Sequence, residues 1–407
     1  MAFDLKIMVA DKIQEMTESA TIRMAQKARE LASKGVNVIS LSLGEPDFDT
    51  PEHIKDAAID GLHKGMTKYT PVSGTLELKN AIIRKMKRDS GLDYQGNQIV
   101  ISNGAKQSIF NICTAVIDPG DEVIIFAPYW VSYFEIVKFC HGTPVIVSAG
   151  IEDEFKVSAA QVAAAITSKT RMIIFSSPCN PTGSVFTGDE LAAIAEVIKS
   201  HDNIVVVSDE IYEYINFQSK HASIASVPGM QEITAVVNGF SKGFSMTGWR
   251  LGFMAGPAWL ASACDKVQGQ VTSGAASFSQ HAAAVGLDSD MEPTSEMTRA
   301  FKKRRDLVID QLKQIPGLIV NNPQGAFYVF PDVSYYFGKS DGTNTIHNAD
   351  DFSEIMLAEA HVGLVSGSAF GADQCIRISY AASEEDLTEA IKRLKNCLSK
   401  FKENIVT

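Results

Sequence analysis

The sequence predicts an α/β protein: a large domain with a mainly parallel sheet of the seven-stranded type flanked by helices, and a smaller α+β domain built from both chain ends. Short apolar runs alternate with amphipathic stretches through the middle of the chain, which is the pattern of βα units around a parallel sheet. Both flanks instead carry isolated strands beside longer charged helices. The 407 residues, 45% of them hydrophobic and 21% charged, are enough to bury a sizeable core.

The central region begins with a predicted strand at residues 98–102, followed by a helix at residues 105–117. The helix ends at the turn formed by residues 118–121, and an apolar run then predicts the next strand. The same unit repeats along the chain, with a clear intervening helix at residues 189–200. The predicted strands are residues 98–102, 122–126, 143–147, 172–176, 204–208, 234–238 and 251–255.

The chain ends are organised differently from the centre. The first part of the chain predicts one helix and one strand, and the last part predicts a long charged helix, two strands and a closing amphipathic helix. These elements are the helices at residues 21–33, 293–315 and 384–402 and the strands at residues 36–41, 318–332 and 375–380. We therefore divide the chain into a smaller domain of residues 1–50 and 293–407 and a large domain of residues 51–292.

Composition and charge argue against several classes of protein. A net charge of -11 and a pI near 5.3 disfavour binding to a phosphate backbone, so nucleic acid is not an expected partner. No basic segment with a following apolar run opens the chain, and no later stretch is apolar enough to span a membrane, which predicts a soluble, cytoplasmic protein. The six cysteines are scattered without a C-x-x-C pair, so we expect no metal site.

The densest chemical motif is the run at residues 239–252, Gly-Phe-Ser-Lys-Gly-Phe-Ser-Met-Thr-Gly-Trp-Arg-Leu-Gly, which directly follows an apolar run. The Lys242 amine can form an imine with an aldehyde cofactor, give way to a substrate amine, and then move a proton as a general base. Ser241 and Arg250 can hold a phosphate group. The run resembles the cofactor-lysine signature of class I aminotransferases, which are fold type I pyridoxal-phosphate enzymes, and is most like the prokaryotic subgroup of aspartate aminotransferases.

The resemblance implies pyridoxal 5'-phosphate as the cofactor, and a second group of residues suits it. Asp209 follows the predicted strand at residues 204–208, at the carboxyl end where α/β folds place ligand sites. Its carboxylate suits a protonated pyridine nitrogen, which makes the ring an electron sink. By resemblance, Tyr212 donates a hydrogen bond to the phenolic oxygen of the cofactor. Lys242, Asp209 and Tyr212 are therefore the predicted catalytic residues.

Three further segments resemble the substrate-binding positions of the family. Asn180 matches an asparagine that contacts both the phenolic oxygen and the substrate carboxylate, although Cys179 replaces the first of the two asparagines usual in this loop. Gly44 lies in a Gly-Glu-Pro-Asp-Phe turn whose backbone approaches the substrate carboxylate in the family. Arg377, in the predicted strand at residues 375–380, matches the arginine whose planar fork binds the α-carboxylate.

The remaining candidates surround the cofactor. Gly104, Ala105 and Lys106 lead from a strand into a helix, so their backbone N–H groups can meet the phosphate at the helix N-terminus. Trp130 is similar to the family aromatic that stacks on the pyridine ring and borders the substrate. Tyr69 resembles the tyrosine that reaches the cofactor phosphate of the neighbouring subunit. The resemblance therefore implies a homodimer with shared active sites.

The implied reaction is ping-pong transamination between an L-amino acid, aspartate in the first place, and 2-oxoglutarate, so amino acids and 2-oxo acids are the expected partners. The stretch at residues 270–277 lacks the arginine that another aspartate aminotransferase subgroup carries there. Thr17 stands where some relatives have a lysine. Aromatic, alanine-type and prephenate aminotransferases therefore stay open, as does a lyase of the same fold, since the same residues would serve its chemistry.

Three other functions fit the sequence less well. Residues 239–243 also satisfy the G-x-S-x-G elbow of α/β-hydrolases, but the later histidines lie in no recognisable setting. Residues 338–340 end like a phosphate-binding loop, but the required glycine five places earlier is Val333. A ligand-sensing regulator would need a DNA-binding domain, and only about 20 residues precede the first family-like helix. We therefore expect an enzyme.

Overall fold

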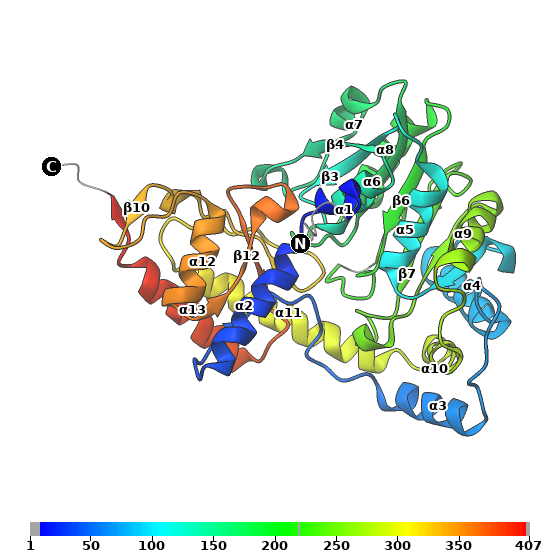
Figure 1. The fold of residues 1–407 in the computed structure, drawn as a ribbon, viewed down its shortest axis with the longest axis horizontal. Coiled ribbons are helices and arrows are strands. Elements are labelled where there is room, and N and C mark those ends of the chain that lie inside the picture. The colour runs from blue at the N-terminus through cyan, green and yellow to red at the C-terminus, as the bar shows by residue number, and fades with distance from the viewer. Residues whose placement is uncertain (1–8, 219, 404–407) are drawn as a thin grey trace, which may run out of the picture.

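The computed structural model describes residues 9–218 and 220–403, which form two lobes (Figure 1). The larger lobe contains a seven-stranded sheet in the order β2-β8-β7-β6-β5-β3-β4. Only β8 is antiparallel to its neighbours, β2 and β7, and the other pairs are parallel. The strands are β2 (Ile99–Ser102), β3 (Glu122–Ala127), β4 (Thr143–Ser148), β5 (Thr170–Ser176), β6 (Val205–Asp209), β7 (Thr234–Gly239) and β8 (Gly252–Ala255). The predicted sheet is confirmed, with every strand end within two residues of its expected place.

Helices cover both faces of this sheet, which explains why its strands are almost uniformly apolar. Neighbouring residues point to opposite faces. Ile125 and Val207 pack toward α5, α6 and α9, whereas Ile124 and Val206 pack toward α7 and α8. On this second face, α3, α4 and α10 cover the part formed by β2 and β8. These helices are α3 (Glu52–His63), α4 (Leu76–Ser90), α5 (Ala105–Val116), α6 (Ser132–Phe139), α7 (Ala159–Ala165), α8 (Gly188–Lys199), α9 (Ala258–Val271) and α10 (Ser277–Asp288).

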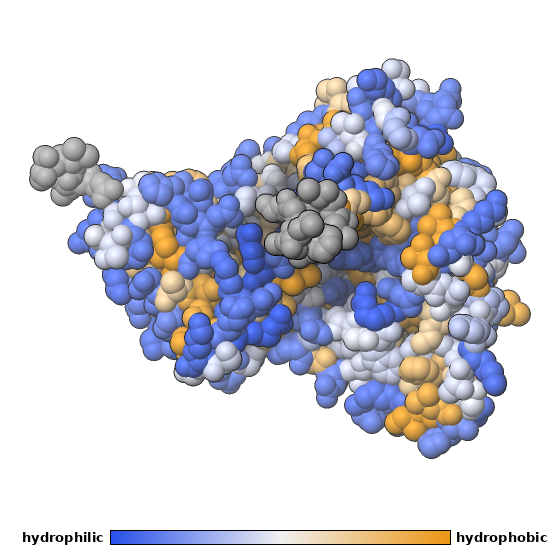
Figure 2. Space-filling model, viewed as in Figure 1, coloured by the Kyte–Doolittle hydropathy of each residue, from blue (hydrophilic) through white to orange (hydrophobic). Residues whose placement is uncertain are grey.

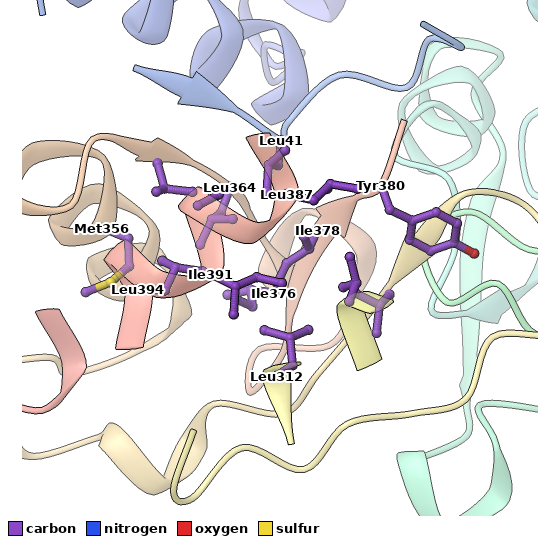
Figure 3. Close-up of a cluster of buried hydrophobic side chains, with 14 of the residues drawn as sticks. Leu41, Leu312, Met356, Leu364, Ile376, Ile378, Tyr380, Leu387, Ile391 and Leu394 are labelled. Atoms are coloured by element: carbon purple, nitrogen blue, oxygen red, sulfur yellow. The ribbon is translucent and has the colours of Figure 1, made fainter. Parts of the chain in front are cut away.

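The smaller lobe brings the two chain ends together. Strand β1 pairs in parallel with β11 through Ile39 and Val362, and β12, β13 and β9 form an antiparallel sheet. In its core, side chains of α12 and α13 meet Ile378 of β13 and Leu41 from the N-terminal part (Figure 3). The elements are α2 (Ala20–Ser33), β1 (Ile39–Ser40), β9 (Tyr328–Val329), β10 (Lys339–Ser340), α12 (Ala349–Glu359), β11 (Val362–Gly363), β12 (Val365–Ser366), β13 (Ile376–Ser379), α13 (Glu384–Leu398) and β14 (Lys402–Glu403). The short helix α1 (Asp11–Gln14) lies instead against α6 of the larger lobe, with Lys12 Nζ 4.5 Å from the centre of the Phe139 ring.

Helix α11 (Glu292–Leu312) connects the lobes. At 21 residues it is about 30 Å long. Near its start, the Thr294 hydroxyl donates a hydrogen bond of 2.7 Å to the Gly243 carbonyl, one residue after Lys242. At its end, Leu312 is buried in the core of the smaller lobe (Figure 3). The helix therefore ties the segment around Lys242 to the smaller lobe.

The predicted strand at residues 318–332 is wrong over most of its length, because only β9 is a strand there. The segment contains Pro323, which cannot donate a ladder hydrogen bond, and Ala326 adopts a positive φ of 55°. The Asn321 side chain instead donates to the Thr182 carbonyl at 2.7 Å and accepts from the Phe330 N–H at 2.8 Å. The chain thus crosses toward the large lobe before β9 begins. The strand expected at residues 36–41 is likewise reduced to β1.

We keep the boundaries at residues 50/51 and 292/293 as a proposal; the second coincides with the start of α11. Residues 1–8 and 404–407, assigned above to the smaller domain, lie outside the described residues. Among the described residues, no helix is both long and apolar enough to cross a membrane. The face in Figure 2 is mainly hydrophilic, with small scattered hydrophobic patches.

Candidate active site

A cavity of about 340 Å³ lies at the carboxyl ends of β5 and β6, the edge at which α/β proteins bind ligands. Its wall combines residues of the large lobe with Gly44, Tyr328 and Arg377 of the smaller lobe. Most of the predicted site residues meet here. Those that line the cavity are Gly44, Ala105, Lys106, Trp130, Asn180, Asp209, Tyr212, Ser241, Lys242, Arg250 and Arg377.

Lys242 lies in the turn after β7 and lines the cavity. Its Nζ donates a hydrogen bond to the Gly44 carbonyl of the smaller lobe and lies 5.8 Å from the centre of the Tyr212 ring. Burial, reinforced by the positive charge of Arg377, lowers the pKa of Lys242 from 10.5 to about 8. Near neutral pH this amine is therefore unprotonated, and nucleophilic, more often than that of an exposed lysine.

The lowered pKa of Lys242 predicts a pH-dependent stability of the ligand-free protein. The folded pKa of about 8 lies below the ordinary 10.5, so between these pH values the unfolded chain binds more protons and the free energy of unfolding rises with pH. The full contribution is about 3 kcal/mol. We expect urea unfolding to show the wild type gaining this stability relative to Lys242→Met across the window. A pH-independent difference between the two proteins would contradict the lowered pKa.

Asp209 is the last residue of β6 and is only 4% exposed. Its Oδ2 accepts a hydrogen bond of 2.6 Å from the Tyr133 hydroxyl, and its Oδ1 accepts one of 3.2 Å from the Ile211 N–H. Burial raises the pKa of Asp209 to about 6, although both hydrogen bonds favour the ionised form. A carboxylate in this position gains from a cation placed against it, such as a protonated ring nitrogen.

Two tyrosine hydroxyls meet beside the cavity. The hydroxyls of Tyr212 and Tyr328 are 2.8 Å apart, and both side chains are buried. Burial, with a further contribution from Tyr328, raises the pKa of Tyr212. Tyr212 therefore keeps its proton and can donate it in a hydrogen bond. Tyr328 was not among the predicted site residues, because it lies in a run that is typical of a core strand.

Arg377 projects from β13 and is 2% exposed. Its Nη1 donates to the Asn180 side-chain oxygen at 2.9 Å, and its Nη2 donates to the Ser42 carbonyl at 2.6 Å. The guanidinium carbon lies 4.5 Å from the centre of the Tyr328 ring. Among the described residues, its buried Nε has no hydrogen-bond partner. The guanidinium therefore has donor capacity left for an anion in the cavity.

The cavity is rich in cations that lack anionic partners. In the described parts of the chain, none of its four basic side chains forms a salt bridge with a carboxylate. This is unusual for a protein with a net charge of -11. Uncompensated positive charge in a recessed site attracts anions. The four side chains are Lys106, Lys242, Arg250 and Arg377.

One end of the cavity has the features of a phosphate site. Gly104 adopts a φ of +89° at the start of α5, and a Cβ there would lie 2.5 Å from Arg250 Nη2. Only glycine therefore lets the arginine approach the helix N-terminus, where Ala105 and Lys106 also line the cavity. Lys106 Nζ lies 4.8 Å from the centre of the Trp130 ring. Burial, together with the charge of Arg250, lowers the pKa of Lys106.

One predicted residue, Tyr69, lies away from the cavity, and one residue that was not predicted, Tyr133, belongs to it. Tyr69 does not line the cavity; its side chain is 99% exposed, so it makes little contact within this chain. Tyr133 was not predicted, although it supports Asp209 directly. Its place three residues after Trp130, in the first turn of α6, is the signal that could have identified it, since the two rings pack edge to face with their centres 5.5 Å apart and both line the cavity.

Comparison with known proteins agrees with this geometry. The family model described as aminotransferase class I and II matches residues 36–394. A bifunctional aspartate aminotransferase and glutamate/aspartate-prephenate aminotransferase from Petunia hybrida is 45% identical over 98% of this chain and 84% of its own length. The aspartate aminotransferase of Bacillus subtilis is 42% identical over 96% of this chain and 99% of its own.

Solved structures show the same relationship. The crystal structure of the aspartate aminotransferase from Rhizobium meliloti covers 97% of this chain and 99% of its own with a TM-score of 0.94 at 40% identity. The Thermus thermophilus enzyme with maleate has a TM-score of 0.90 at 38% identity, over 96% of this chain and 99% of its own. The match therefore covers both lobes, and the chain belongs to the class I and II aminotransferase family.

Proposed function

We propose that the protein is a pyridoxal-phosphate-dependent aminotransferase that moves an amino group between L-aspartate and 2-oxoglutarate. The observation that carries this proposal is the combination, in one cavity, of a buried carboxylate at Asp209 with four basic side chains that have no carboxylate partner. A phosphorylated pyridine cofactor and a carboxylate substrate together would compensate these charges. Membership of the aminotransferase family supports the same chemistry.

The residues present fit pyridoxal phosphate. The cavity of about 340 Å³ is within the size range of small-molecule sites. When bound, the cofactor supplies an aldehyde for covalent attachment and a ring that accepts electrons from the substrate Cα. We assign the ring nitrogen to Asp209, the phenolic oxygen to Tyr212 and Asn180, and the ring face to Trp130. The phosphate is assigned to Gly104, Ala105, Lys106, Ser241 and Arg250.

Each side chain has a separate role in the proposed reaction. The Lys242 amine would hold the cofactor covalently and, as a free amine, would carry a proton to and from the substrate Cα, for which a pKa of about 8 is suitable. Asp209 holds the proton on the ring nitrogen. Arg377 binds the substrate α-carboxylate beside Asn180, whose side-chain oxygen already fixes one arm of the guanidinium. The Gly44 carbonyl holds the Lys242 amine between the two lobes.

The substrate assignment rests on the names of the relatives and on the unpaired cations of the cavity, which favour an anionic ligand. The Petunia hybrida and Bacillus subtilis proteins are both named for aspartate, and the Petunia hybrida protein also for prephenate. Ser19 and Thr21 of the N-terminal segment also line the cavity, so this segment borders the space in which the substrate would bind. A homodimer in the cytoplasm completes the proposal. The exposed Tyr69 is available to a second copy of the chain.

An amino-acid panel tests the proposal. We expect the purified protein to be yellow, and aspartate or glutamate to bleach this visible absorption while the matching 2-oxo acid forms at one equivalent per site. Addition of 2-oxoglutarate should then restore the colour, because both half-reactions use one site. Aromatic amino acids and alanine are tested in parallel as amino donors, and prephenate is tested as an amino acceptor in place of 2-oxoglutarate. Ammonia release without restoration by 2-oxoglutarate would identify a lyase and overturn the proposal.

A further inference from the structure

The turn that carries Asp209 and Tyr212 has a second, buried face. Asp209 and Tyr212 line the cavity, whereas Glu210 and Glu213, between and after them in the chain, do not. Glu210 is 0% exposed and Glu213 is 6% exposed. The turn is closed by a hydrogen bond of 2.9 Å from the Glu213 N–H to the Glu210 carbonyl. One turn therefore places two side chains in the site and two carboxylates behind it.

Glu210 is held by a complete set of partners. Its Oε1 accepts hydrogen bonds from Ser223 Oγ at 2.5 Å and Ser208 Oγ at 2.9 Å. Its Oε2 lies 3.0 Å from Nε2 of His221. Burial acts to lower the pKa of His221, but the charge of Glu210 and its hydrogen bond outweigh burial, and the net pKa is raised. The raised pKa favours the charged imidazolium, which compensates Glu210.

Glu213 is neutralised separately. Lys85 of α4 is buried, with its Nζ 2.6 Å from the Glu213 carboxylate and 3.5 Å from Asp89. Carboxylate and imidazole atoms of Glu210, Glu213 and His221 all lie within 4.8 Å of one another. This spacing is also found in metal sites, but Lys85 already supplies the positive charge at Glu213. We therefore assign the group as an ion-pair network, not as metal ligands.

We propose that Glu210 and His221 form a buried positioning pair, which fixes the turn bearing Asp209 and sets the electrostatic potential at the Asp209 carboxylate. The pair rests on the proposed function, since Asp209 serves the ring nitrogen of the cofactor. Glu210 is the next residue after Asp209, and its charge opposes ionisation of Asp209. The other titratable or charged groups around Asp209, Glu210 and His221 are Lys85, Tyr94, Tyr133, Cys179, Tyr212, Glu213 and Lys242.

Two variants that break the same pair should have opposite effects. Glu210→Gln keeps the shape of the side chain but removes the negative charge beside Asp209, so Asp209 should ionise at lower pH. His221→Gln keeps a hydrogen-bond donor but leaves the charge of Glu210 uncompensated, so Asp209 should ionise at higher pH. A purely structural role would weaken the site in the same direction in both variants. The double variant should return toward the wild type.

The experiment measures the dissociation constant of pyridoxal phosphate for the full-length apoprotein between pH 5 and pH 8.5 by fluorescence quenching, with metal content determined in parallel. In the wild type we expect binding to weaken below about pH 6, as Asp209 becomes protonated. We expect this acid limb to move up by roughly one pH unit in His221→Gln and down by a similar amount in Glu210→Gln. Ser208 and Ser223 still donate to Glu210 in His221→Gln, so this variant should fold even if Glu210→Gln does not, and its upward shift is then sufficient.

The matched controls are His201→Gln and Glu196→Gln, which make the same chemical changes at exposed positions and should leave the acid limb in place. Shifts in the same direction, an unmoved acid limb, or a bound metal lost in both variants would each overturn the positioning pair. If the wild type binds no pyridoxal phosphate at any pH, the proposed function itself fails. If it binds with an acid limb that the variants do not move, only the positioning pair fails.

Discussion

Lys242→Ala should abolish transamination and the covalent attachment of the cofactor. The variant loses both the amine that attaches the cofactor and the general base that moves the substrate proton. General acid–base catalysis alone contributes roughly 10²- to 10⁴-fold, so we expect kcat to fall by roughly 10⁴-fold or more. The cavity keeps its remaining cations, so pyridoxal phosphate should still bind without a covalent bond. Borohydride reduction followed by mass spectrometry measures the attachment, and the amino-acid panel measures turnover.

The control for this variant is Lys199→Ala, in which an exposed lysine paired with Glu196 on α8 is truncated far from the cavity. Lys199→Ala should retain colour, attachment and turnover, because an isolated exposed ion pair contributes little to stability. Lys242→Arg separates charge from nucleophilicity: it restores a cation near Gly44 but cannot attach the cofactor. Wild-type turnover in Lys242→Ala, or attachment at another lysine, would refute the assignment of Lys242.

The central sheet could be predicted because its strands carry a strong local signal. Each is a short apolar run bounded by turn residues, since a strand covered by helices on both faces must be apolar along its length. The segment at residues 318–332 is also apolar at both ends, but there the apolar residues serve the core of the smaller lobe from an irregular chain. The hydrophobicity of a segment predicts that it is buried, but it does not predict that its backbone is extended.

Helix α4 was not assigned from the sequence, although its signal was present. Its buried residues Leu78, Ile82 and Met86 recur at intervals of four, close to the helical period of about 3.6 residues, so they share one face. Thr75 also accepts a hydrogen bond from the Leu78 N–H, as an N-cap residue does. The many charged residues between them hide this pattern in average hydropathy. The helix matters functionally because it carries Lys85 to the turn of Asp209.

The candidate site was predicted well where function lies in short motifs and poorly where it depends on distant contacts. Lys242, Asp209 and Asn180 each lie in a run whose neighbours identify it. The Ser42 carbonyl that holds Arg377 is 335 residues away in sequence, and Tyr328 lies 116 residues from its partner Tyr212. The first contact joins the two chain ends within the smaller lobe and the second joins the two lobes, and nothing in either local sequence specifies the partner.

The unpaired cations of the site come from both lobes. Lys106, Lys242 and Arg250 belong to the large lobe, whereas Arg377 belongs to the smaller one, so the fourth cation joins the other three only where the lobes meet. Contact between the lobes adds to the repulsion among these cations, as the effect of Arg377 in lowering the pKa of Lys242 indicates. A bound anion removes this repulsion. The ligand should therefore stabilise the contact between the lobes as well as the fold.

Arg377→Ala should cause the second largest loss of activity, by weakening the binding of substrate and not that of the cofactor. Truncating one partner of a buried, hydrogen-bonded charge pair costs about 2–5 kcal/mol, so we expect kcat/KM for both the amino acid and the oxo acid to fall by roughly 10²- to 10³-fold. Arg377→Lys should recover only part of this loss, because an ammonium group cannot donate to both Asn180 and the Ser42 carbonyl while also binding a carboxylate at two points.

Retention of the cofactor distinguishes a loss of substrate binding from a general disruption of the fold in these variants. Arg377 is assigned no cofactor contact, so the visible absorption and the covalent attachment at Lys242 should persist in Arg377→Lys. Arg171→Lys is the matched control, since Arg171 also projects from a strand and donates to a carbonyl, that of Asn203 at 2.8 Å, but lies outside the cavity. Equal losses for both arginines, or an Arg377→Lys protein without colour, would show that Arg377 supports the fold and would remove it from the substrate site.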